Sequence, residues 1–267
     1  MKRRTLRPHA SARRPSFCLL STFTGSPPQE DPDRPTRLES DTVPDIDVRL
    51  TEPAAEIAKL IDDWLTGYIT KPHAELGRSG PVCPFVEPSR RAGCLVLYTA
   101  EWRPEFGLSH MVDTVDNAVE YFATHEWDSR NSNLHSLLVA VPDLPRDAYW
   151  LIDKAHELTK DRVVARGFML GQFHPTCEEP AARNSGFPVN RSPIPLFAVR
   201  NMALHDILFL HADDVWFAEY ERRHGRHYEK PDRIAPDFVR LFQDARARLA
   251  GGPHQRRTDS LNTGRIR

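Results

Sequence analysis

The stretch Phe168-Met-Leu-Gly-Gln-Phe-His174-Pro-Thr-Cys-Glu-Glu-Pro180 leads into a loop that continues to Pro195 and is dense in Pro, Asn and Arg. An apolar segment precedes this loop, and a second, residues 196–210, follows it. A long loop between two buried segments costs ordering entropy, so it is usually either functional or disordered. Its composition argues against disorder, because apolar residues interrupt the polar ones throughout. The sequence therefore predicts an ordered loop that builds a site.

The bulk composition limits the function classes. The chain has 267 residues, of which 40% are hydrophobic, and a formal net charge of −1. This length allows one domain of generous size or two small ones. A near-neutral net charge lacks the positive excess typical of proteins that bind nucleic acid. No apolar run approaches the roughly 18 residues that a membrane span needs. The four cysteines show no CxxC spacing, so we expect a reduced, cytoplasmic protein without nucleic-acid or membrane partners.

The two ends differ in composition from the middle of the chain. Residues 1–44 begin with a basic cluster and continue as a segment rich in Pro, Asp and Ser. We interpret them as a disordered leader, because the apolar part is too short and too interrupted for a signal peptide. Residues 251–267 resemble a second disordered tail. The prediction is a single α/β domain over residues 45–250.

Alternating helix and strand signals indicate the fold class. Apolar residues recur at helical spacing between Ile57 and Ile69, and short apolar runs that suggest buried strands occur at 93–99, 136–141 and 163–173. Helical patterns separate the strands and also follow near 213–221 and 236–249, whereas residues 194–199 fit either a strand or a helix start. We expect an α/β or α+β protein with a single mixed β-sheet of about four strands and packed helices.

Four sequence blocks resemble those of an uncharacterised bacterial family. They are a helix containing Trp64, Cys83-Pro84-Phe85, Phe173-His174-Pro175, and Asn190-Arg191-Ser192-Pro193-Ile194-Pro195 with Arg200 downstream. The resemblance covers residues 55–205 and brings no known activity with it.

The size, the Arg/Pro composition and the motif order are also similar to the haem proteins that N-hydroxylate L-arginine in D-cycloserine biosynthesis. This second resemblance implies a haem b cofactor containing iron, and an electron donor or peroxide as co-reactant. The implied activity is a monooxygenase of antibiotic biosynthesis that converts the guanidine of L-arginine to N-omega-hydroxy-L-arginine. The implied partner is therefore a small-molecule amino-acid substrate.

His205 is the candidate metal ligand for such a cofactor. In a helix predicted over residues 199–210 it shares a face with Met202, Leu208 and Phe209. An imidazole on an apolar helix face is the arrangement that a proximal haem ligand needs. A buried histidine satisfied by a backbone group or an acid is the alternative.

Three arginines, Arg183, Arg191 and Arg200, lie in or beside the loop. Guanidinium groups pair with carboxylates in a bidentate manner, so haem propionates or a substrate carboxylate are natural partners. Ion pairs with Glu178, Glu179 or Asp206 are the alternative.

His174 and Glu178 are the candidate catalytic residues. His174 would serve as a second candidate for the iron ligand or as a distal group, or would only hold the loop in place through a backbone carbonyl. Glu178 would receive the substrate guanidinium.

Two other functions remain open on the same residues. Cys83 with His174 suggests a nucleophile and base, and His174 with Cys177 has the spacing of zinc ligands, so a zinc- or cysteine-dependent hydrolase using Cys83, His174 and Cys177 is one alternative. The other is a non-enzymatic domain that binds a small molecule or partner and clamps an anionic ligand with the loop around Asn190 and Arg191.

Overall fold

The computed structural model describes residues 48–251. These residues belong to one compact unit, Asp45–Arg267. The predicted leader, 1–44, and all but the first residue of the predicted tail, 251–267, lie outside the described residues.

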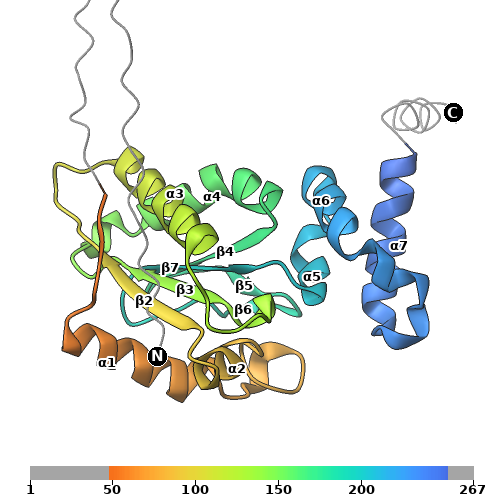
Figure 1. Ribbon diagram of the computed structural model, residues 1–267, viewed down its shortest axis with the longest axis horizontal. Helices are drawn as coiled ribbons and strands as arrows, with labels where there is room; N and C mark the ends of the chain where they lie inside the picture. Colours follow the sequence, from red (N-terminus) through yellow and green to blue (C-terminus); the bar gives the residue numbers. More distant parts are fainter. Residues whose placement is uncertain (1–47, 252–267) are drawn as a thin grey trace, which may run out of the picture. The chain divides into compact units, whose positions relative to one another are not determined.

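A five-stranded mixed sheet lies at the centre of the domain, with strand order β1-β2-β3-β7-β4 (Figure 1). β2 and β3 pair in parallel, whereas β7 is antiparallel to both of its neighbours, β3 and β4. β2, β3 and β4 therefore run in one direction, and β1 pairs antiparallel with β2 at the edge. The strands are β1 Leu50–Thr51, β2 Leu95–Ala100, β3 Ser136–Ala140, β4 Phe168–Phe173 and β7 Leu196–Asn201.

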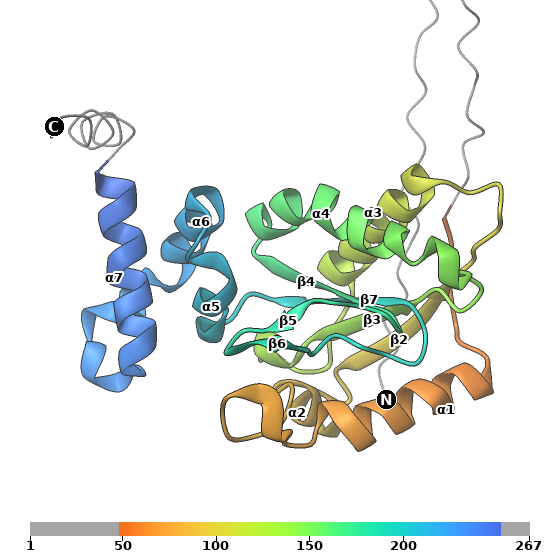
Figure 2. The ribbon, with the colours of Figure 1, turned by 180° about the vertical axis from the view of Figure 1, so that it is seen from behind.

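Helices cover both faces of the sheet. α3 (Leu108–Thr124) and α4 (Trp150–Ala165) pack on one face, while α1 (Ala55–Trp64) and α2 (Val86–Arg91) lie on the other (Figures 1 and 2). Side chains of a strand alternate between faces, and every residue of β3 is buried. Leu137 and Val139 join the core beneath α3 and α4, and Leu138 and Ala140 join the core beneath α1.

α1 continues without a break into a π-helical turn, Leu65–Ile69. In this turn the amide of Thr70 donates to the carbonyl of Leu65, 2.9 Å away. Leu65 and Ile69 are both buried against the sheet. The extra residue in the turn keeps the apolar positions of this long segment directed at the sheet.

The remaining elements lie beside the β4 edge and at the C-terminal end. The hairpin β5 (Pro180–Ala181) and β6 (Asn184–Pro188) forms within the central loop. The helices α5 (Ile207–Leu210), α6 (Asp214–His224) and α7 (Pro236–Ala250) enclose their own apolar cluster, and α6 contacts α4 (Figure 2). Short 3-10 helices span Ala74–Leu76, Ser132–Leu134, Arg146–Ala148, Leu204–Asp206, Gly225–Glu229 and Pro231–Arg233.

The predicted fold class, one mixed sheet with packed helices, is confirmed. The sheet has five strands instead of about four, and the β5–β6 hairpin was not predicted. The helix predicted over residues 199–210 is wrong at its start, because β7 continues to Asn201. Val199 pairs with Leu137 on one side and Leu170 on the other, and these ladder bonds hold the chain extended. No helix among residues 48–251 is long and apolar enough to cross a membrane.

Phe197 tests the central position of β7. Its side chain is fully buried beneath α3 and α4, so we expect Phe197→Ala to lower the free energy of unfolding by about 3–5 kcal/mol. Phe209→Ala is the matched control, because Phe209 is 45% exposed, and its effect should stay within about 1 kcal/mol. Urea denaturation followed by circular dichroism measures both. Equal losses in the two variants would contradict this account of the core.

Candidate functional site

A cavity of about 580 Å³ lies against the α1 face of the sheet and extends past the free edge of β4, where side chains of α4 reach it. Pockets of this volume typically hold small molecules. Its floor is formed by apolar side chains of β2, β3 and β7, and its walls come from α4, the central loop and the segment before α2. The cavity lining includes Cys83, Phe85, Leu138, His156, Lys160, Phe173, Glu179, Arg183, Asn190, Ala198, Arg200, His205 and Asp206.

Two side chains close the free edge of β4 next to this cavity. An edge strand leaves alternate carbonyls unpaired, and unpaired backbone groups are costly when they are buried. His156 donates from Nε2 to the carbonyl of Leu170 over 3.2 Å, and Asn190 donates from Nδ2 to the carbonyl of Gln172 over 3.0 Å. The first side chain comes from α4 and the second from the central loop, so β4 fixes both walls of the cavity.

A buried ion pair lies at the end of β7. Arg200 donates from Nη1 and Nη2 to the two carboxylate oxygens of Asp206, over 2.7 and 2.6 Å. Asp206 is fully buried and also accepts the amide of Ala203 over 2.7 Å. Burial lowers the pKa of Arg200, but the charge and hydrogen bonds of Asp206 outweigh it and hold that pKa above its usual value. The guanidinium carbon also lies 4.6 Å from the centre of the Phe85 ring.

His205 reaches the cavity from the short 3-10 helix Leu204–Asp206, not from the longer helix that the sequence predicted. Its side chain is exposed. Phe85 and Phe238 meet its ring edge-on, with centroid distances of 5.9 and 5.5 Å. Within residues 48–251 neither ring nitrogen of His205 forms a hydrogen bond.

The three loop arginines pair with acids at three different places. Arg183 lines the cavity and pairs with Asp237 of α7. Arg200 pairs with Asp206, as described above. Arg191 instead donates to Glu178 over 2.8 Å, in an exposed pair outside the cavity lining. Of the predicted cofactor-binding residues, Arg183, Arg200 and His205 therefore meet at one cavity, and Arg191 does not.

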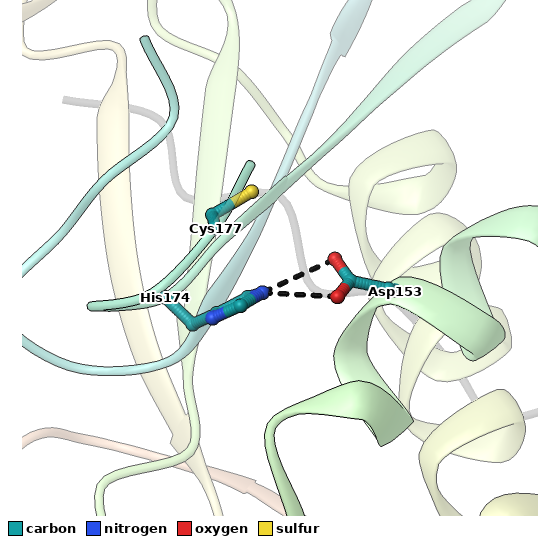
Figure 3. A group of neighbouring side chains, drawn as sticks. All are labelled: Asp153, His174 and Cys177. Atoms are coloured by element: carbon teal, nitrogen blue, oxygen red, sulfur yellow. Dashed lines mark hydrogen bonds and ion pairs between the residues drawn. The ribbon is translucent and has the colours of Figure 1, made fainter. Parts of the chain in front are cut away.

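His174 follows the last residue of β4 and belongs to a separate cluster outside the cavity lining (Figure 3). Its Nε2 lies 3.2 and 3.1 Å from the two carboxylate oxygens of Asp153 on α4, and its Nδ1 lies 3.2 Å from Oγ1 of Thr176. Cys177 completes this cluster, and burial raises the pKa of its thiol to about 11. Glu178, the other predicted catalytic residue, points away to Arg191.

Cys83 is not part of the His174 cluster. It lines the cavity, where it is half-buried and close enough to Arg200 to interact with its charge. The sequence thus suggested the right partner for His174 in Cys177, and the structure does not bring Cys83 to His174.

Sequence reasoning missed the contributions of α4. Asp153, His156 and Lys160 are three, four and seven positions apart, so one helix face directs all three toward β4 and the loop. Lys160 lines the cavity with its ammonium 4.1 Å from the centre of the Trp216 ring, and burial lowers its pKa. The available signal was their spacing of three and four residues, which places them on one face of the helix.

Residues 58–235 match the model of a family described as a domain of unknown function, DUF6875. The chain belongs to this family. The matched segment includes the cavity lining from Trp64 to Asp206 and all three residues of the His174 cluster. No curated protein matches the chain, and no solved structure matches it. Membership of an uncharacterised family is thereby established, while the similarity to arginine-hydroxylating haem proteins remains a prediction.

His156 makes stability depend on pH. Burial lowers its pKa from 6.5 to about 4, so the folded state binds this proton more weakly than the unfolded state does. Its contribution is therefore complete above pH 6.5 and is lost as pH falls from 6.5 to about 4.

We expect His156→Gln to flatten this part of the stability profile, since glutamine keeps an N–H donor for Leu170 but does not titrate. The flattening should amount to at most about 3.5 kcal/mol between the two pH limits, at roughly 1.4 kcal/mol per pKa unit. Urea denaturation between pH 4 and 7 measures the profile. The exposed His227→Gln is the control and should keep the wild-type slope. An unchanged slope in His156→Gln would contradict the assignment.

Proposed function

We propose that the DUF6875 domain binds a small carboxylate-bearing molecule of amino-acid size in the cavity on the α1 face. The charge of the lining is the observation that carries this proposal. Four basic residues, Arg78, Lys160, Arg183 and Arg200, face two acids, Glu179 and Asp206. Low-dielectric walls strengthen the attraction of such a site for a carboxylate.

The proposed contacts follow from the donors that remain available. Arg200 uses three of its five N–H groups on Asp206 and the carbonyl of Asn201, which leaves two for a ligand carboxylate. Lys160 supplies a second positive charge from the α4 wall. Glu179, which accepts from Gln172 over 3.3 Å, supplies a negative charge for a ligand ammonium. Leu138 and Ala198 offer an apolar floor for the rest of the molecule.

Lys160→Met tests the binding proposal. Removing one ammonium from the lining should weaken the binding of a carboxylate ligand by roughly 10- to 100-fold, because a charge-assisted hydrogen bond contributes roughly 1.5–3 kcal/mol. A panel of amino acids and their decarboxylated amines, measured by calorimetry, identifies the ligand and shows whether its carboxylate is needed.

The matched control is Lys154→Met on the same helix. Lys154 pairs with Glu157 at the surface and does not line the cavity, so its loss should leave the affinity unchanged. Equal affinity for a carboxylate and its amine analogue, or equal effects of the two lysine variants, would overturn the proposal.

Haem-dependent oxygenation of the ligand is the enzymatic alternative, with the guanidine of L-arginine as the target. His205 favours it, because its ring stands at the cavity and neither of its nitrogens has a hydrogen-bond partner among residues 48–251. The surroundings fit a haem poorly, however. His205 is exposed, the described residues offer no carbonyl or carboxylate to orient its second nitrogen, and Arg183 and Arg200 already pair with acids. We therefore propose ligand binding as the primary function, and haem-dependent oxygenation as an alternative that an absorption spectrum can test.

The haem alternative predicts a Soret band when the protein is titrated with haem. His205→Ala should abolish the band if His205 holds the iron, and His211→Ala should preserve it, because the Nδ1 of His211 already pairs with the carbonyl of Ile207. Absorption spectroscopy, followed by mass spectrometry after incubation with arginine and a reductant, is the measurement. A colourless protein after titration would exclude this alternative and leave the binding proposal standing.

A further inference from the structure

We propose that Asp153, His174 and Cys177 form a binding site for a divalent metal ion of the zinc class, separate from the cavity. One ligand atom from each residue lies within 4.8 Å of the other two (Figure 3). Sulfur, imidazole nitrogen and carboxylate oxygen are the ligands that zinc takes in proteins. A thiolate and a carboxylate together carry two negative charges, which balance the charge of a divalent ion.

The distances leave room for an ion. Tetrahedral zinc at about 2.0–2.3 Å from its ligands places those ligands roughly 3.3–3.8 Å apart. The His174 nitrogen and the nearer Asp153 oxygen are 3.1 Å apart, and all three ligand atoms lie within 4.8 Å of one another, so an ion needs an adjustment that opens the first pair slightly and closes the widest one by up to about 1 Å. Asp153 can make it, since its side chain is 49% exposed on α4.

The backbone holds the two buried ligands in place. The amide of Cys177 donates to the carbonyl of His174 over 3.1 Å, and the amide of Ser192 reaches the same carbonyl at 3.4 Å. The turn between them contains Pro175, which fixes one backbone angle. His174 and Cys177 are therefore presented by a closed turn at the end of β4, not by a flexible segment.

Groups around the ligands already match those of a metal centre. A histidine that binds a metal through one nitrogen usually pairs its other nitrogen with a hydrogen-bonding group. Here Nδ1 of His174 meets the hydroxyl of Thr176, which can either donate or accept and so suits both the free and the metal-bound tautomer. The amide of Glu179 also approaches the sulfur of Cys177.

The exposure of the three ligands defines the class of site. His174 and Cys177 are buried, at 3% and 1%, while Asp153 faces solvent. Three protein ligands with one side open to water are typical of zinc sites that keep a coordination position for water or a substrate. A purely structural site would have four protein ligands, and residues 48–251 supply three here.

Cobalt titration of the full chain tests the proposal. The protein is stripped with a chelator and titrated with Co²⁺, which gives a charge-transfer absorption when a thiolate binds it. We expect one equivalent to bind with this absorption, and Zn²⁺ to displace it. Cys177→Ser should abolish the absorption and weaken binding by more than about 100-fold, and Thr176→Ala should weaken binding by roughly 10-fold.

Two matched controls separate ligation from a structural effect. Cys83→Ser removes a half-buried cysteine outside the cluster and should leave the cobalt spectrum unchanged. Asp153→Asn should weaken binding at least about 10-fold, whereas Asp147→Asn, an exposed acid just before α4, should not. Because Asp153 is at the surface, its variant folds even if Cys177→Ser does not.

Three results would overturn the proposal: no stoichiometric binding to the stripped wild type, a charge-transfer absorption that survives in Cys177→Ser, or equal affinities of the two aspartate variants. Lys160→Met should bind cobalt normally. A failure of the cavity proposal is thus distinguishable from a failure of this one.

Discussion

The insertion of β7 between β3 and β4 is the constraint on which the rest of the structure depends. Leu196 stands opposite Ala140 on one side and Phe173 on the other, so the chain must return to the end of β4 that it left at His174. The two ends of the central loop, 174–195, therefore lie next to each other at one edge of the sheet. Ordering this loop costs entropy, and its hydrogen bonds to the β4 edge, the β5–β6 hairpin and the apolar cluster around Phe187 offset that cost.

The direction of α4 relative to β4 separates two chemical environments. Asp153 lies against His174 and His156 bonds to Leu170, so residues earlier in the helix meet residues later in the strand and the two elements run in opposite senses. Asp153, nearer the start of α4, consequently meets His174 after the end of β4, and Lys160, two turns later, faces the cavity. A single helix face thus serves a cluster of metal-ligand type at one end of β4 and a basic cavity wall toward the other.

The sequence predicted the local elements well and their lateral order poorly. Helical and strand patterns located the Ile57–Ile69 segment, β2 and β3, because burial on one face leaves a period in the sequence. The strand predicted over residues 163–173 begins only at Phe168, because residues 163–165 end α4. Nothing in the pattern of residues 194–201 states that this strand inserts between β3 and β4. The same limit applies to the site: His174 and Cys177 are close in sequence and were paired correctly, whereas Asp153 joins them only through the packing of α4 on β4. The sequence pattern predicts a helix that starts at Val199 and carries His205. This start is wrong because pairing with β3 and β4, which the local sequence does not reveal, holds Val199 in a strand.

The buried Arg200–Asp206 pair contributes more to positioning groups around the cavity than to the stability of the fold. Removing two charges from water costs several kcal/mol per ion, so apolar residues of similar volume would often stabilise the fold as well or better. This pair instead does three geometric things. It ties the end of β7 to the turn at Ala203 and holds a guanidinium against the Phe85 ring. Within residues 48–251 it also leaves two N–H donors of that guanidinium uncommitted beside the cavity. A hydrophobic replacement would preserve the packing but would present no donor, and the cavity would keep its shape while losing the group best suited to recognise a carboxylate.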